Sequence, residues 1–163
     1  MSYAWMYGCA KMGMHFVAYG PKDLMEKIDK EVVRKAKEVA AYTGGTIEIS
    51  DDINSVKDAD VIYTDVWASM GEESQIPEKV KMLTPYKVTM DLLKATENDD
   101  VIFMHCLPAF HDFETKMAKE QKELGFDIRE VTDEVFRSRH SVVFDEAENR
   151  MHTIKAVIVA TIA

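Results

Sequence analysis

Apolar residues recur along the chain in two patterns: short continuous runs, and stripes spaced three or four residues apart. Short runs bounded by turn residues are typical of buried strands, whereas the wider spacing is typical of helices that bury one face. The runs predict strands over residues 15–19, 46–49, 61–64 and 101–104. The stripes and capping residues predict helices over residues 1–12 and 24–42, short helical turns over 51–57 and 132–136, and a solvated helix over 116–123.

A last helix is predicted from Asp145 onward, with one apolar face made of Ala147, Met151, Ile154, Ile158 and Ile162. Between the third and fourth predicted strands we expect a long loop, in which Gly71 and Pro77 act as turn residues.

Strands that alternate with helices predict right-handed crossovers and a parallel sheet covered by helices. We therefore expect one α/β domain over residues 1–163, with a three-layer, doubly wound parallel sheet. Ligands of such sheets bind beyond the carboxyl ends of the strands, which here selects the loops that begin at Asp65 and Cys106. One departure is that the chain opens on a helix, where a doubly wound domain normally opens on a strand.

Composition narrows the possible partners. The 163 residues include 47% hydrophobic and 30% charged residues, with a formal net charge of −9, so binding to nucleic acid through a basic surface is not expected. No segment approaches the ~20 apolar residues that span a bilayer, and no basic stretch precedes an apolar one at the start. Two cysteines make no disulfide framework. We expect a cytoplasmic protein without membrane or nucleic-acid partners.

The segment that starts at Asp65 carries the first candidate site. A carboxylate at a strand end can accept hydrogen bonds from a substrate ammonium group, Ser69 adds a small donor and acceptor, and Gly71 permits a tight backbone turn. The alternative is a helix cap followed by a surface loop, and the spacing alone does not separate the two.

Cys106 is the second candidate, and it follows His105 directly. Such a pair is compatible with a thiolate or a metal ligand. However, neighbours on a strand point to opposite faces, and no spacing of four ligands suggests zinc, so no metal site is expected. The alternative is a buried structural cysteine.

Arg150 is the third candidate. Its guanidinium could fork onto two oxygens of an anionic substrate. The alternative is a solvated helix face, on which Glu146 pairs with Arg150 and Glu148 pairs with His152 at i,i+4 spacing.

Three strings, DVWASMGEE, FMHCLPAFHD and VVFDEAENRMHTIKAV, occur in an order that resembles the ornithine carbamoyltransferases. The resemblance covers nearly the whole chain and matches the family's C-terminal, ornithine-binding half. The related enzymes that use aspartate typically have proline where this chain has Cys106. The resemblance implies half of an aspartate/ornithine carbamoyltransferase-like fold that lacks its central first strand, which would lie between the strands near Val17 and Ile62. Its absence would leave these two strands with unpaired edges or force them to pair directly.

The resemblance also implies a reaction, in which the δ-amino group of ornithine attacks carbamoyl phosphate to give citrulline and phosphate without a cofactor. Asp65 would orient the amino groups of ornithine, and Cys106 would lie beside the attacking amine as a positioning group. Ser69, the backbone of Met70 and the backbone of Leu107 would contribute to substrate binding. Arg150 would reach carbamoyl phosphate, and the segment 69–77 would close over the substrate.

The family's first half supplies a Ser-x-Arg-Thr-Arg phosphate cradle that has no counterpart in this chain. We therefore expect weak ornithine binding, carbamoyl phosphate binding only with the missing domain, and an inactive isolated chain. Unpaired strand edges predict a homo-oligomer or a loosely folded monomer. The aromatic residues Tyr3, Trp5 and Tyr7 suit a surface that is buried against another copy. The alternative is a truncated or engineered α/β domain that self-associates and has no catalytic function.

Overall fold

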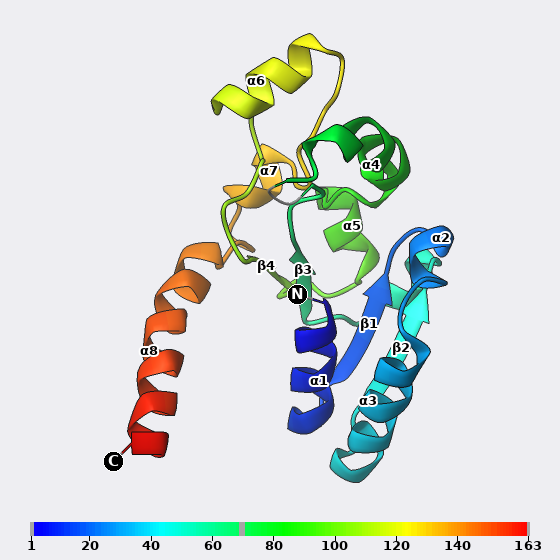
Figure 1. Cartoon of the computed structure of the whole chain (residues 1–163), viewed down its shortest axis with the longest axis vertical. Helices are drawn as coiled ribbons and strands as arrows, with labels where there is room; N and C mark the ends of the chain where they lie inside the picture. The colour runs from blue at the N-terminus through cyan, green and yellow to red at the C-terminus, as the bar shows by residue number, and fades with distance from the viewer. Residues whose placement is uncertain (1, 69–70, 163) are drawn as a thin grey trace. The chain divides into compact units, whose positions relative to one another are not determined.

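The computed structural model describes residues 2–68 and 71–162. The chain divides between Lys57 and Asp58 into two compact units, each with its own parallel strand pair (Figure 1). Among the described residues, no helix combines the length and apolar character needed to cross a membrane. The structure is a mixed α/β fold with parallel sheets, as the alternation of strands and helices predicts.

The first unit contains two strands that pair in parallel, with His15 opposite Thr46 and Tyr19 opposite Ser50. Its elements are α1 (Ser2–Met12), β1 (His15–Tyr19), α2 (Lys22–Met25), α3 (Lys30–Thr43), β2 (Thr46–Ser50) and the 3-10 turn η1 (Ile53–Val56).

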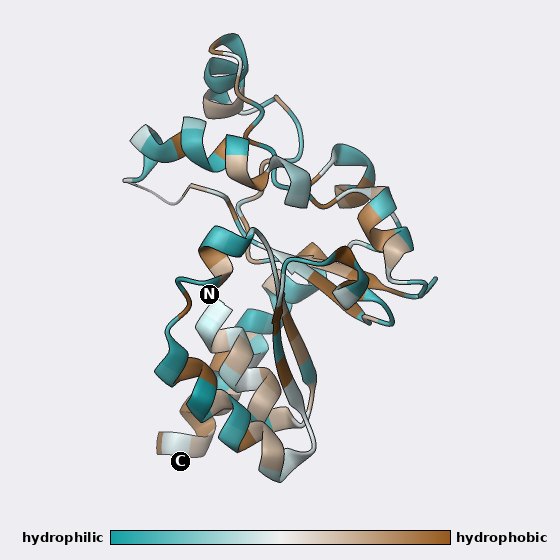
Figure 2. Cartoon of the chain, turned by 90° about the vertical axis from the view of Figure 1, so that its right-hand side faces the viewer, coloured by the Kyte–Doolittle hydropathy of each residue, from teal (hydrophilic) through white to brown (hydrophobic). Residues whose placement is uncertain are grey.

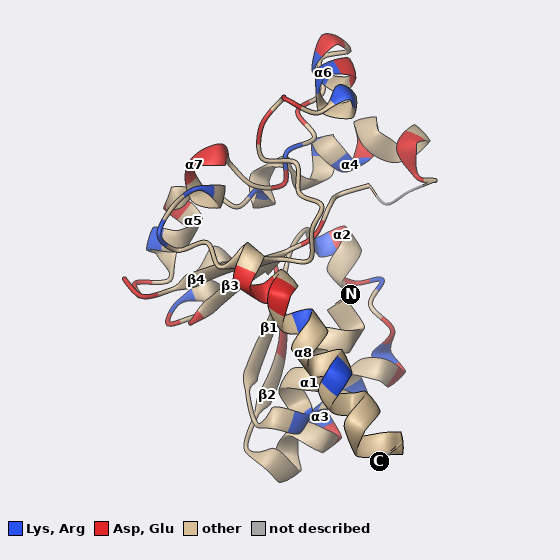
Figure 3. Ribbon diagram, turned by 90° about the vertical axis from the view of Figure 1, so that its left-hand side faces the viewer, with Lys and Arg blue, Asp and Glu red and all other residues tan. Residues whose placement is uncertain are grey.

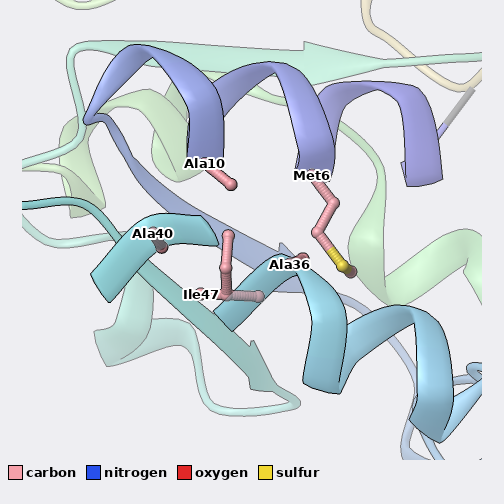
Figure 4. Close-up of a cluster of buried hydrophobic side chains, with 5 residues drawn as sticks. All are labelled: Met6, Ala10, Ala36, Ala40 and Ile47. Carbon is pink, nitrogen blue, oxygen red and sulfur yellow. The ribbon is translucent and has the colours of Figure 1, made fainter. Parts of the chain in front are cut away.

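Small side chains let α1 and α3 pack closely in this unit. Figure 4 shows Met6 and Ala10 of α1 turned toward Ala36 and Ala40 of α3 around Ile47 of β2. All five are at most 6% exposed, so they form a dry core whose burial stabilises the unit.

The turns at the end of this core require glycine. A Cβ on Gly45 would lie 2.5 Å from the carbonyl oxygen of Met14, and a Cβ on Gly13 would lie 2.7 Å from that of Thr43. Neither oxygen belongs to a side chain that could rotate away. The α1–β1 and α3–β2 connections therefore touch backbone to backbone.

The predicted helix over 24–42 is two helices. Asp29 interrupts it, because its side chain accepts hydrogen bonds from the backbone N–H groups of Glu31 and Val32 and so caps the start of α3. Gly44 ends α3 in the left-handed conformation.

The second unit pairs its two strands in parallel, with Val61 opposite Ile102 and Thr64 opposite His105. Its elements are β3 (Val61–Thr64), η2 (Glu73–Gln75), α4 (Ile76–Leu83), η3 (Thr84–Tyr86), α5 (Met90–Ala95), β4 (Ile102–His105), α6 (Lys116–Glu123), α7 (Asp133–Phe136) and α8 (Val143–Ile162). Figure 2 shows that the strands are mostly hydrophobic, whereas the helices mix both kinds of residue.

The long loop predicted between β3 and β4 is wrong in part, because it contains α4 and α5. Pro77 does not break this segment. It stands in the first turn of α4, where its missing N–H would have no helical partner. Thr89 starts α5 by accepting a hydrogen bond from Leu92 N–H.

Among the described residues, β1 pairs only with β2, and β3 is hydrogen-bonded in a sheet only with β4. The resemblance left two outcomes open for the strands near Val17 and Ile62, namely direct pairing or separate edges. The structure has them in separate sheets.

Helix α8 is apolar but solvent-exposed beyond its first residues. Val143 is its only buried residue among those described, and two residues of its first turn, Asp145 and Glu146, are acidic (Figure 3). The exposed apolar residues are Phe144, Met151, Ile154, Val157, Ile158, Val159 and Ile162.

Candidate functional site

Asp65 and Cys106 meet at one end of the β3–β4 pair. Because Thr64 and His105 are partners in the parallel register, the residues that follow them leave the sheet at the same edge. The Cys106 thiol donates a hydrogen bond to Asp65 Oδ1 at 3.1 Å. The same oxygen accepts the backbone N–H of Val66 at 2.8 Å, which fixes the carboxylate at the strand end.

The Cys106 thiol is held in its protonated form. Burial raises the pKa of this thiol above its usual value, a hydrogen bond with Tyr63 opposes the rise, and the adjacent Asp65 carboxylate adds to it. A protonated thiol is a hydrogen-bond donor and a weak nucleophile. The geometry therefore suits Cys106 to positioning rather than to covalent attack.

The loop that carries Cys106 is fixed through the imidazole of His105, which is 1% exposed. Its Nδ1 accepts the backbone N–H of Leu107 at 2.9 Å, and its Nε2 lies 3.0 Å from Glu130 Oε1. Since Nδ1 is an acceptor, the network assigns the ring proton to Nε2, which donates to the carboxylate. Leu107 has a φ of +48° and is joined to Pro108 by a cis peptide bond.

Glu130 is a fully buried carboxylate that the sequence analysis missed. Its Oε1 accepts from His105 and also from the backbone N–H of Phe110 at 2.6 Å, while Oε2 has no hydrogen-bond partner among the described residues. Buried acidic residues are rare without such a role. No local pattern in the sequence marked it, because its partners His105 and Phe110 lie 25 and 20 residues away along the chain.

Glu146 of α8 supports the same loop from another side. Its carboxylate accepts the backbone N–H of His105 at 2.9 Å, and burial raises the pKa of this carboxyl. The surface pair of Glu146 with Arg150, the alternative for this helix, is not formed, because Glu146 bonds to His105. The second surface pair is formed, with His152 Nε2 at 3.8 Å from Glu148.

The predicted site residues are only partly assembled. Asp65, Cys106 and Leu107 belong to the adjoining loops described above. Arg150 lies on α8 one turn beyond Glu146 with an exposed side chain, and the described residues give it no contact with Asp65 or Cys106. Ser69 and Met70 lie outside the described residues.

Mostly apolar side chains connect the two loops, with Lys79 among them. They enclose a cavity of about 20 Å³, which has room for roughly one water molecule. Its lining comprises Trp67, Ala68, Ile76, Lys79, Val80, Phe110, Met117 and Ile128.

A second polar cluster lies farther along the Cys106 loop. One nitrogen or oxygen atom of each of His111, Asp112 and Asp133, of the kind that can bind a metal ion, lies within 4.8 Å of the other two. Arg137 pairs with both carboxylates, at 2.9 Å from Asp133 and 3.7 Å from Asp112, and so neutralises much of their charge. The His111 ring also stacks on Phe136 at 3.8 Å. These contacts make the cluster a partly exposed ion-pair network.

The chemistry available at the strand ends is electrostatic. Asp65, Glu130 and Glu146 are three carboxylates around one short loop, and no described contact brings a Lys or Arg side chain to them. Such a site attracts an ammonium group and can position an amine, since a carboxylate and a thiol both hydrogen-bond to amines.

Comparisons with known proteins identify the family and the fold. The family model for the Asp/Orn binding domain of aspartate/ornithine carbamoyltransferases matches residues 1–161. The catabolic ornithine carbamoyltransferase of Clostridium perfringens strain 13 is 62% identical over 99% of this chain and 49% of that protein. The ornithine carbamoyltransferase of Limosilactobacillus reuteri strain DSM 20016 is 56% identical over 99% of this chain and 49% of that protein.

Solved structures match as well. Ornithine carbamoyltransferase from Pyrococcus furiosus matches with a TM-score of 0.79 and 40% identity, over 97% of this chain and 45% of that one. The anabolic enzyme from Campylobacter jejuni matches with a TM-score of 0.80 and 30% identity, over 98% of this chain and 46% of that one. The chain thus spans about half the length of these relatives.

Proposed function

Because the chain belongs to the aspartate/ornithine carbamoyltransferase family, as its Asp/Orn binding domain, we propose that it forms the ornithine-binding half of an ornithine carbamoyltransferase. The complete reaction transfers the carbamoyl group from carbamoyl phosphate to the δ-amino group of ornithine. The observation that carries the proposal is the hydrogen bond between Cys106 and Asp65 where β3 and β4 end.

Each proposed role follows from the chemistry of the residue. Asp65 binds and orients the ammonium groups of ornithine. The protonated Cys106 lies beside the attacking amine, which must be neutral to react, and the Leu107 backbone completes that side. Ser69, the Met70 backbone and Arg150 are proposed from the family resemblance, the first two toward ornithine and Arg150 toward carbamoyl phosphate.

We propose further that this chain alone is catalytically inactive and binds ornithine weakly. Phosphate binding needs clustered cations, and the Asp65–Cys106 site is surrounded by carboxylates instead. Carbamoyl phosphate would therefore bind only together with the other half that the relatives carry. The two free cysteines suit a reducing, cytoplasmic location.

Calorimetric titration with ornithine tests the binding role. We expect a Kd on the order of 1 mM, or about −4 kcal/mol, for the unmodified chain. Asp65→Asn should abolish binding, because it removes the charge that pairs with the ammonium group. Asp91→Asn, which changes an exposed carboxylate of a surface pair, is the matched control.

Norvaline, which lacks the δ-amino group, should bind more weakly than ornithine. Equal heats from ornithine with the unmodified chain and with Asp65→Asn would refute the role of Asp65. Citrulline formation by the isolated chain would refute its inactivity.

A self-associating domain is the second candidate. The observation that favours it is the exposed apolar surface of α8, whose residues Phe144, Met151, Ile154, Ile158 and Ile162 recur at helical spacing. An apolar helix face of this kind is stabilised by burial against another surface. We propose that, in the isolated chain, a second copy provides that surface.

A further inference from the structure

Six side chains in the second unit form a continuous series of ion pairs and cation–ring contacts, here called the Asp127 network. Its members are Trp67, Lys87, Asp127, Arg129, Phe113 and Lys122. The network begins in the loop that follows Asp65 and ends in the loop that follows Cys106, with its continuation on α6. It therefore connects the two loops that carry the candidate site.

Asp127 is the centre of this network. Its carboxylate accepts Lys87 Nζ at 2.8 Å, Arg129 Nε and Nη2 each at 2.8 Å, and the backbone N–H of Arg129 at 3.1 Å. The Lys87 and Arg129 side chains are only 12% and 26% exposed, so solvent screens these pairs less than it screens a surface pair. Partial burial raises the pKa of Asp127, but the hydrogen bonds from Arg129 and Lys87 outweigh it and hold that pKa well below its usual range.

The cations of the network reach aromatic rings on both sides. Lys87 Nζ lies 5.7 Å from the centre of the Trp67 ring, and Arg129 Cζ lies 4.1 Å from the centre of the Phe113 ring. Lys122 Nζ lies 4.2 Å from the same Phe113 ring. Contacts of this length are attractive, because the face of an aromatic ring is electron-rich.

The backbone connects the Asp127 network directly to the residue that holds the Cys106 loop. Burial alternates from Asp127 to Glu130: Asp127 and Arg129 are partly exposed, whereas Ile128 and Glu130 are buried. Glu130 is the acceptor that holds His105 and the Phe110 backbone. Its carbonyl oxygen also accepts the N–H of Val88, next to Lys87, at 2.9 Å. One short segment thus carries both the centre of the Asp127 network and the carboxylate that holds the Cys106 loop.

We infer that Asp127 is a positioning residue for the Asp65–Cys106 site, acting on the Asp65 loop through Lys87 and Trp67 and on the Cys106 loop through Arg129 and Phe113. The effect on ornithine rests on the proposed function, but the effect on the two loops does not. Without the Asp127 carboxylate, Lys87 and Arg129 lose their shared anion, and both loops gain freedom.

Two reporters allow each loop to be followed separately. Trp5 and Trp67 are the two tryptophans of the chain and Cys9 and Cys106 its two cysteines, so Trp5→Phe and Cys9→Ser leave one reporter in each loop. In this background, Asp127→Asn should raise acrylamide quenching of Trp67 and the alkylation rate of Cys106 by about three- to tenfold, the range that loss of roughly 1 kcal/mol of local stability produces. Asp127→Glu, which keeps the carboxylate, should restore most of both values. Asp91→Asn should change neither.

Two variants each remove only one of the cations bound by Asp127, and are here called one-sided variants. They distinguish positioning from a general loss of stability, and they replace Asp127→Asn if that variant does not fold. Lys87→Met should increase quenching of Trp67 and leave Cys106 alkylation within about twofold of the background. Arg129→Met should increase the alkylation rate of Cys106 and leave quenching of Trp67 within about twofold of the background. A general destabilisation would move both reporters together in every variant.

The inference is overturned if Asp127→Asn behaves like Asp91→Asn at both reporters, or if the two one-sided variants affect both reporters equally. Ornithine titration of the same proteins separates this result from the proposed function. If the reporters respond and the unmodified chain binds no ornithine, the proposed function fails and the positioning role of Asp127 stands. If ornithine binds and the reporters do not respond, the positioning role of Asp127 fails and the proposed function stands.

Discussion

Cys106 shows how its surroundings select one of the roles that a cysteine can take. The residue type and its neighbour His105 were compatible with a thiolate, a metal ligand or an inert buried side chain. The structure turns the imidazole away from the thiol, toward Glu130 and the Leu107 backbone, and gives the thiol the Asp65 carboxylate as its acceptor. A neighbouring anion disfavours a second negative charge, so the thiol keeps its proton.

The reactivity of Cys106 toward iodoacetamide should show this directly. Burial and Asp65 both raise the pKa of the thiol, so in a Cys9→Ser background its alkylation rate should rise with pH only above the range of an ordinary thiol. Asp65→Asn removes the anion, lowers the pKa and should speed alkylation at pH 8 by about three- to tenfold. Alkylation that is slower in Asp65→Asn would contradict the assignment.

Replacing Glu130 should lower the stability of the fold more than a change at an exposed position does. Replacing it with leucine leaves the His105 ring N–H and the Phe110 backbone N–H buried without their acceptor. We expect Glu130→Leu to lower the free energy of unfolding by about 3–5 kcal/mol, measured by urea denaturation. Glu134→Leu, at an exposed position of α7, should change it by less than about 0.5 kcal/mol. A tolerated Glu130→Leu would show that the loop does not depend on this acceptor.

At the scale of elements, sequence patterns predicted the strands better than the helices. The runs at residues 15–19 and 61–64 match β1 and β3, because a short apolar run between turn residues has few other stable conformations. The helix over 24–42 failed at Asp29, where a side-chain cap outweighs apolar periodicity. Helix α4 was missed because Pro77 was interpreted as a turn residue and not as part of the first turn of a helix. Helix α5 was missed because the whole segment between the third and fourth strands was interpreted as one loop.

The part of the site that directly follows the predicted strands could be predicted from the sequence, and the rest could not. Asp65 and Cys106 follow strands whose parallel pairing is visible in the sequence, so their proximity could be expected. Glu130 and Glu146 reach the Cys106 loop from segments distant in sequence. Their roles depend on tertiary packing, which local spacing does not encode.

Helix α8 supports a prediction about self-association. Its apolar residues are exposed, whereas the aromatic residues of α1 are partly used inside their own unit: Tyr7 packs against the core and the Tyr3 hydroxyl accepts Asp29 N–H. We therefore expect Ile154→Glu to reduce oligomer size in sedimentation velocity more than Trp5→Ala does. A compact monomer for the unmodified chain, or no response to Ile154→Glu, would remove the proposed contact through α8.

At the scale of the whole molecule, the chain forms two units that each have a two-stranded parallel sheet. Two-stranded sheets are marginal alone and depend on helices packed against them. We therefore expect the two units to unfold separately, in two unfolding transitions.

Gly45→Ala tests this expectation. The new Cβ would meet the Met14 carbonyl oxygen at 2.5 Å, so we expect the first unit to lose about 3 kcal/mol or more of stability. Gly8→Ala, on an open face of α1, should instead stabilise that unit by about 0.5–1 kcal/mol. Hydrogen exchange should show faster opening of residues 2–57 in Gly45→Ala and unchanged protection of β3 and β4. Equal loss of protection in both units would mean that they unfold together.

The exposed end of α8 also bears on the fate of the chain in a cell. Chaperones and proteases recognise accessible apolar segments, and they act on whatever fraction of a protein presents them. A chain whose last helix stays uncovered would be turned over quickly. Its abundance would then be set by how soon after synthesis another surface covers that helix.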